Sequence, residues 1–132
     1  MKGFDTNVLV RYLVKDDPEQ ATIVAKLIVE AAETEAPIYL DMIVLCETVW
    51  VLESGYDYAK DTIADVLEKL LLTQQFELEE RDQVWRALRR YRAGKGDLAD
   101  YLIGESNLAA DCERTVTFDR ALLEEHGFEV LA

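Results

Sequence analysis

The sequence is poor in the residues that make linkers, flexible loops and metal cages. Its 132 residues include 2 Pro, 6 Gly, 2 Cys and 1 His. Apolar residues recur along the whole chain, which excludes disorder as the main state. Cys46 and Cys112 are far apart and belong to no Cys-x-x-Cys motif, which argues against a zinc site and predicts two reduced, buried thiols.

Long hydrophobic runs are absent as well. No apolar stretch approaches the ~20 residues that a membrane-spanning helix needs. The N-terminal residues reach a carboxylate at Asp5 without the apolar segment of a secretory signal. We therefore expect a cytoplasmic protein without membrane contact. A length of 132 residues suits a single domain, residues 1–132, with a core of its own.

Positive charge is scarce, with 14 Lys and Arg against 27 Asp and Glu and a net charge of −13. Such a surface repels nucleic acid at long range and attracts cations or basic partners. Several of the few basic residues nevertheless lie close together in the sequence. They are Arg81, Arg86, Arg89, Arg90, Arg92 and Lys95. The part of this group from Arg86 to Lys95 could hold a phosphate backbone, or it could neutralise nearby acids and a helix dipole.

The spacing of apolar residues predicts helices that alternate with short strands. Strands are expected at residues 2–5, 37–40, 76–78, 115–118 and 128–131. Helices are expected at 8–14, 17–31, 41–55, 58–72, 80–93 and 97–110, with a helical turn between the last two strands. This alternation implies parallel strands joined by right-handed crossovers, and therefore an α/β sandwich. In such folds the chemistry collects beyond the carboxyl ends of the strands.

Carboxylates stand at these strand ends. Asp5 and Asp119 each follow a strand, while Asp97 and Asp100 share one face of the first turn of a helix. Glu47 lies in a helix that is apolar nearly all round, where a carboxylate is either paired or bound to something. Taken singly, each acid is also an ordinary helix cap or surface charge. If they converge, a divalent cation would relieve their repulsion, and oxygen ligands alone indicate Mg²⁺ or Mn²⁺.

Four short motifs carry a resemblance to a known family. They are Phe4-Asp5-Thr6-Asn7-Val8-Leu9, the segment 45–52 around Glu47, Asp97-Leu98-Ala99-Asp100-Tyr101-Leu102-Ile103, and Thr117-Phe118-Asp119. Together and in this order they resemble a PIN domain, and most closely the VapC-like toxins of toxin–antitoxin pairs. The resemblance covers essentially the whole chain. It implies a three-layer α/β/α sandwich with a central, mostly parallel sheet, and a Mg²⁺- or Mn²⁺-dependent ribonuclease.

The resemblance also implies roles for individual residues. The catalytic and metal-binding acids would be Asp5, Glu47, Asp100 and Asp119, with Asp97 as a further metal ligand. The residues that would orient these ligands by hydrogen bonds are Thr6, Asn7 and Thr117. Members of this family pair with a small antitoxin and usually dimerise, so both partners are expected here. The RNA that is cut cannot be read from these motifs.

Other interpretations remain open. The basic residues that could hold the RNA backbone are Arg11, Arg86, Arg89 and Arg90, and structural pairing with acids is the alternative. A Mg²⁺-dependent phosphatase with an Asp nucleophile would want a second acid two positions after Asp5, where Asn7 stands. A non-catalytic RNA- or protein-binding module, in which the acids are only caps and surface charges, is the other alternative.

Overall fold

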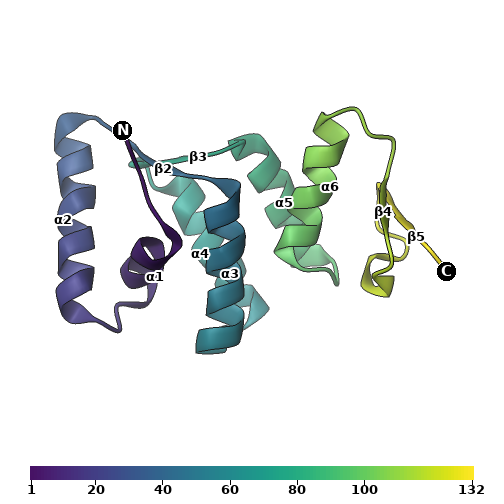
Figure 1. Ribbon diagram of the computed structural model, residues 1–132, viewed down its shortest axis with the longest axis horizontal. Helices are drawn as coiled ribbons and strands as arrows, with labels where there is room; N and C mark the ends of the chain where they lie inside the picture. Colours follow the sequence, from purple (N-terminus) through teal and green to yellow (C-terminus); the bar gives the residue numbers. More distant parts are fainter. The chain divides into compact units, whose positions relative to one another are not determined.

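The computed structural model describes all 132 residues, and the chain divides into two compact units, Met1–Arg81 and Asp82–Ala132. We call them the N-terminal unit and the C-terminal unit and describe each by itself (Figure 1). The N-terminal unit contains β1 (Lys2–Gly3), α1 (Thr6–Val14), α2 (Pro18–Thr34), β2 (Ile38–Leu40), α3 (Met42–Tyr56), α4 (Lys60–Leu72) and β3 (Phe76–Leu78). α5 (Arg81–Ala93) begins at the last residue of this unit. The C-terminal unit continues with α6 (Leu98–Ala109), β4 (Thr115–Thr117), a 3-10 turn η1 (Arg120–Leu122) and β5 (Phe128–Val130).

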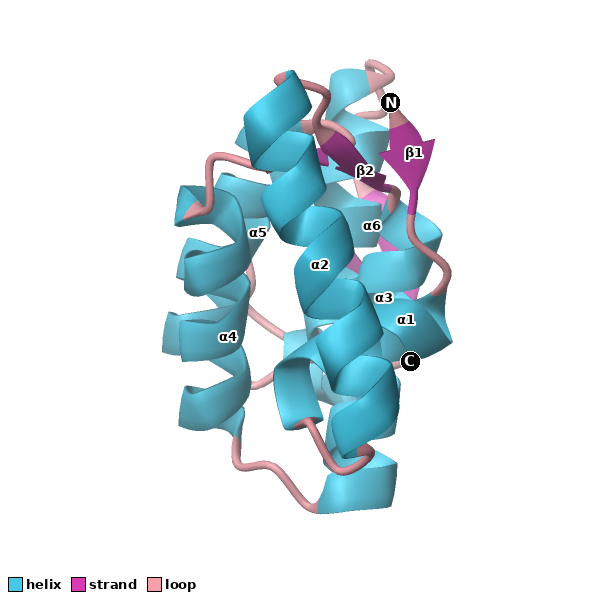
Figure 2. Cartoon of the chain, turned by 90° about the vertical axis from the view of Figure 1, so that its left-hand side faces the viewer, coloured by secondary structure: helices cyan, strands magenta, loops and turns pink.

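A parallel sheet with the strand order β1-β2-β3 organises the N-terminal unit. β1 and β2 lie side by side (Figure 2), and Ile38 of β2 is in register with Phe76 of β3. Ile38, Leu40, Phe76 and Leu78 are buried, whereas Tyr39 is half-buried and Glu77 exposed, as the two-residue period of a strand predicts. α1 lies between α2 and α3 and packs on both (Figure 1).

The C-terminal unit is built on a parallel pair, β4 with β5. Thr115 is in register with Phe128, and α6 packs against β4. Tyr101 of α6 is fully buried and meets Phe128 edge to face, with ring centroids 6.4 Å apart. Leu122 of the 3-10 turn is also buried, so this small unit has apolar residues from α6, η1 and β5 in its core.

Local sequence signals explain where the helices begin. Asp17 and Asp41 are the N-cap residues of α2 and α3, and their side chains accept hydrogen bonds from the Gln20 and Val44 N–H groups. Pro18 occupies the first helical position, where its missing N–H costs nothing. The predicted α/β class with parallel strands is confirmed. The first strand is shorter than expected, and α3 continues through Gly55 to Tyr56.

The two thiols differ from the sequence prediction. Cys46 is half-buried, whereas Cys112 is exposed, so the prediction that both are buried is wrong for Cys112. The reason is local: Cys112 follows Asp111, which has a positive φ of 67° in the turn after α6. A residue in such a turn lies at the surface. None of the helices has both the length and the apolar character to cross a membrane.

Candidate acidic metal site

In the N-terminal unit, a threonine connects two of the predicted acids. Asp5 follows β1 as the N-cap of α1, and its Oδ1 accepts the Thr6 N–H at 2.8 Å. The Thr6 hydroxyl donates to Oε1 of Glu47 at 2.7 Å, which joins the start of α1 to α3 across 41 residues of sequence. Because Thr6 directly follows Asp5, this hydrogen bond holds the Glu47 carboxylate at the N-terminal end of α1, where Asp5 is the cap.

Glu47 lies on the exposed side of α3, although most of its sequence neighbours are apolar. Val44, Leu45 and Val49 are buried on the other side of the helix, while Ile43 and Trp50 stay 72% and 68% exposed. The carboxylate is therefore hydrated as well as hydrogen-bonded to Thr6. Its charge needs no buried counter-ion, and it remains open to a ligand from solvent.

In the C-terminal unit, three predicted acids influence one another. Oδ2 of Asp100 accepts the Asp97 N–H at 2.9 Å, across the first turn of α6. Burial raises the pKa of the Asp100 carboxyl, and the nearby charges of Asp97 and Asp119 raise it further, against the lowering effect of the Asp97 hydrogen bond. The like-charge effect of Asp97 and Asp119 is the repulsion that a bound cation would relieve.

Asp119 is fixed by its own turn. Its Oδ1 accepts the Ala121 N–H at 2.9 Å as the N-cap of η1. Its own N–H donates to the Thr117 hydroxyl at 3.0 Å. Thr117 therefore orders the backbone on which the Asp119 carboxylate stands.

The chemistry of these donors fits a hard divalent cation. Asp5, Glu47, Asp100 and Asp119 each use one carboxylate oxygen in the bonds just described, and each keeps its second oxygen outside them. Carboxylate oxygens without His or Cys suit Mg²⁺ or Mn²⁺. No group of three or more His, Cys, Asp or Glu that could hold an ion is present within either unit.

The predicted RNA-binding arginines have different surroundings. Arg11 is half-buried on α1, where its Nε donates to Gln20 at 2.6 Å and its Nη1 lies 3.3 Å from Asp16. Together with the exposed Asn7 it lines a groove of about 310 Å³ between α1 and α2. Arg89, on α5, is exposed and takes part in none of the ion pairs of the structure.

Arg86 and Arg90 are paired with an acid that sequence reasoning missed. Glu105 is 8% exposed in the middle of α6, with Arg86 Nε at 3.2 Å and Arg90 Nη1 at 3.8 Å. Arg90 also lies over the rings of Tyr101 and Phe128, 5.3 and 5.4 Å from their centroids. A sequence signal was present, because Glu105 stands four residues after Tyr101 and therefore shares its helical face.

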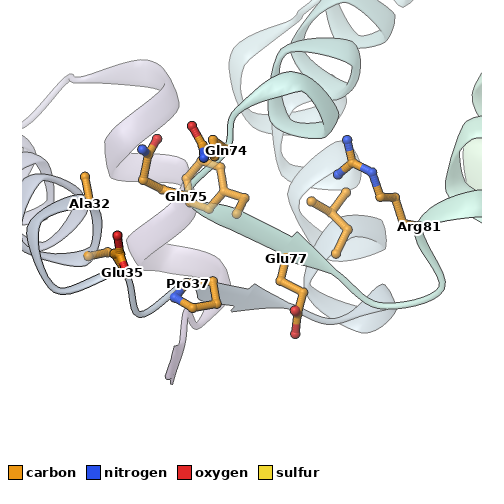
Figure 3. A pocket seen from close by; sticks show the side chains of 10 residues that line it. Ala32, Glu35, Pro37, Gln74, Gln75, Glu77 and Arg81 are labelled. Atoms are coloured by element: carbon orange, nitrogen blue, oxygen red, sulfur yellow. The ribbon is translucent and has the colours of Figure 1, made fainter.

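A cavity of about 580 Å³ in the N-terminal unit is separate from the predicted site. It lies at the C-terminal end of α2 and along β3, and Figure 3 shows lining side chains that include Gln74, Gln75 and Arg81. Arg81 donates a hydrogen bond to the Leu71 carbonyl near the end of α4. None of the predicted site residues lines this cavity.

Comparison with known proteins identifies a family and a relative. Residues 4–128 match the family model described as PIN domain. A "VapC ribonuclease" of Aquifex aeolicus (strain VF5) is 25% identical over 131 residues, which cover 99% of this chain and 96% of that protein. Both matches extend across the N-terminal and the C-terminal unit.

Proposed function

Because the chain belongs to the PIN domain family, we propose that it is a divalent-metal-dependent endoribonuclease, the toxin component of a toxin–antitoxin pair. The observation that carries this proposal is that the acids of the four motifs are present and that their carboxylates have oxygens free to bind a ligand. All of them are present, and each of the four catalytic acids keeps an oxygen outside its structural hydrogen bond. The similarity to a VapC ribonuclease over nearly the whole of both chains supports RNA as the substrate.

The proposed metal ligands are the acids of the four motifs. They are Asp5, Glu47, Asp97, Asp100 and Asp119. The ion would be Mg²⁺ or Mn²⁺, which supplies an activated water and neutralises charge on the scissile phosphate. We propose that residues 1–132 act as one functional domain, since the acids come from both units and the family match extends across both.

The protein's own residues would prepare this site before RNA binds. Thr6 restrains the Glu47 carboxylate by a hydrogen bond, so its remaining oxygen has a defined direction. The Thr117 hydroxyl accepts the Asp119 N–H and so fixes the backbone from which the Asp119 carboxylate extends. Asn7, exposed in the first turn of α1, is available for a further hydrogen bond. Preorganised ligands of this kind lose less conformational entropy when a cation or substrate binds.

Basic residues would bring RNA to an acidic protein. We propose that Arg11, Arg86, Arg89 and Arg90 contribute to backbone binding, with Arg89 the clearest contributor because it is exposed and unpaired. Arg86 and Arg90 hold Glu105 and therefore have a structural task as well. Contacts to phosphate carry no base information, so these residues would not choose the cleavage site.

The resemblance to VapC-like toxins also supports proposals about binding partners and about the place of action in the cell. We propose a homodimer, a small antitoxin that binds it, and a cytoplasmic site of action. The net charge of −13 favours an antitoxin with a basic binding segment. Sedimentation velocity of the purified chain, alone and with the product of an adjacent short reading frame, tests both partners.

RNA cleavage by the purified chain tests the activity. The chain should cleave RNA with Mg²⁺ or Mn²⁺ and stop when EDTA is added. Asp5→Asn should abolish cleavage and leave the fold intact, because it removes one ligand charge and keeps the cap geometry. Asp17→Asn is the matched control, since it makes the same change at another helix N-cap of the same unit. Cleavage that persists in Asp5→Asn, or that Asp17→Asn abolishes equally, would contradict the proposed site.

A further inference from the structure

The hydroxyl of Tyr101 has two partners in the core of the C-terminal unit. It accepts the Gly96 N–H at 3.0 Å and donates to Oε1 of Glu125 at 2.9 Å. Tyr101 directly follows Asp100 in α6, and its side chain turns back toward the N-terminus of the helix, as helical side chains do. The hydroxyl thus reaches the residue that directly precedes Asp97.

The turn before α6 is packed tightly against this tyrosine. A Cβ atom added to Gly94 would lie 1.9 Å from the Tyr101 hydroxyl oxygen. One added to Gly96 would lie 2.6 Å from a methyl carbon of Leu122 and 3.2 Å from Oδ2 of Asp100. Positions 94 and 96 therefore have room for glycine alone, and the position of this turn depends on where the hydroxyl lies.

The ring that carries the hydroxyl is itself held in place. Arg90 lies 5.3 Å from the centroid of the Tyr101 ring, and Phe128 packs against that ring edge to face. Tyr101 is fully buried. Because the ring is held on several sides, the position of its hydroxyl is fixed, and the turn at Gly96 is bonded to that hydroxyl.

We infer that Tyr101 and Glu125 are positioning residues for the acidic pair Asp97 and Asp100. Glu125 orients the Tyr101 hydroxyl, the hydroxyl holds the Gly96 N–H, and Gly96 sets the backbone of Asp97, whose N–H donates to Asp100. The ligand that this pair would hold is a divalent cation, and the effect on cation binding rests on the proposed function. The effect of Tyr101 and Glu125 on the position of the turn does not depend on that function.

Tyr101→Phe tests the inference, because it removes the hydroxyl and keeps the ring. Two quantities are measured on the full chain: the Kd for Mn²⁺ by calorimetry, and the hydrogen exchange of the Asp97 amide. We expect the Mn²⁺ Kd to rise about tenfold or more, as it does when residues behind metal ligands are changed. The Asp97 amide should exchange faster, because the Gly96 backbone next to it is released. An unchanged Kd together with an unchanged Asp97 amide would overturn the inference.

A second pair of variants keeps the inference testable if Tyr101→Phe does not fold. Glu125→Gln retains an oxygen that can accept the tyrosine proton, whereas Glu125→Ala retains none. The glutamine variant should bind Mn²⁺ like the wild type, and the alanine variant should resemble Tyr101→Phe. Equal losses in both variants would show that the charge of Glu125 is what matters, which would overturn a role through the hydrogen bond.

Tyr56→Phe is the matched control. It removes another bond from a tyrosine hydroxyl to a carboxylate, 2.7 Å to Asp16, in the N-terminal unit. It should change neither the Mn²⁺ Kd nor the Asp97 amide. If the wild-type chain binds no Mn²⁺, the proposed function fails, and the positioning inference is then judged on the Asp97 amide alone. Unaltered exchange in Tyr101→Phe would refute it, and faster exchange would support it.

Discussion

Replacing Glu105 with alanine would separate the two interpretations of the basic helix α5. Glu105 is 8% exposed and is the common partner of Arg86 and Arg90. If these arginines mainly serve RNA, losing Glu105 changes stability little. If they mainly serve the fold, Glu105→Ala removes the buried carboxylate with which both guanidinium groups pair.

The structure sets the size of the expected loss. Removing one partner of a buried ion pair typically costs about 3–5 kcal/mol of unfolding free energy. The loss should be smaller here because the Arg86 side chain is 46% exposed and can be hydrated instead. Arg90 is 18% exposed and keeps two aromatic rings and the His126 carbonyl as neighbours. We therefore expect Glu105→Ala to lower the unfolding free energy by about 2–3 kcal/mol, between the buried and the surface limits.

Urea unfolding followed by circular dichroism measures this loss. Glu105→Gln keeps the length of the side chain and one acceptor oxygen, so it should cost about 1 kcal/mol, the range of a neutral hydrogen bond. Arg86→Ala removes only the exposed member of the cluster and should cost no more than about 1 kcal/mol. Glu113→Ala changes an exposed acid of the same unit and should stay within about 0.5 kcal/mol of the wild type.

One result would refute this reasoning. If Glu105→Ala unfolds within about 0.5 kcal/mol of the wild type, as surface substitutions usually do, the cluster does not stabilise the fold. Arg86 and Arg90 would then be available to RNA. A stability loss with unchanged RNA affinity per folded molecule would instead assign both arginines to the structure.

Further predictions concern the metal, the RNA and the packing of α6. Mn²⁺ at 100 times its Kd should stabilise the wild-type chain by about 2.7 kcal/mol, and the resulting rise in melting temperature should vanish in the double variant Glu47→Gln, Asp100→Asn; a persisting rise would mean that the ions bind elsewhere. Arg89→Gln should weaken RNA binding equally for all sequences and reduce the slope of log Kd against log salt by about 1, whereas an unchanged slope would exclude a phosphate contact. Gly104→Ala should lower the unfolding free energy by about 1–3 kcal/mol through overpacking, because its Cβ would lie 2.8 Å from Cζ of Phe128. Thermal melting measures this loss, and the double variant Gly104→Ala, Phe128→Leu should recover part of the lost stability.

Much of the fold could be predicted from the sequence because its signals are local. Asp17 followed by Pro18 starts a helix wherever the segment lies, since capping and the fixed φ of proline act within one turn. The alternation of short apolar strands with amphipathic helices likewise indicated parallel strands. The acids could be named because four motifs occur in the order typical of a PIN domain.

The pairing of side chains was decided by the tertiary structure. Thr6 and Glu47 are 41 residues apart, and Arg86 and Glu105 are 19 apart, so only packing between helices brings each pair together. The exposure of Glu47 could not be predicted because α3 is apolar on both sides, and Trp50 remains in water. A hydrophobic period identifies a buried face only where the opposite face is polar. The sequence by itself therefore determined the helices, the strands and the candidate site residues. Packing between helices determined which of their side chains form hydrogen bonds and ion pairs, because these partners are far apart in the sequence.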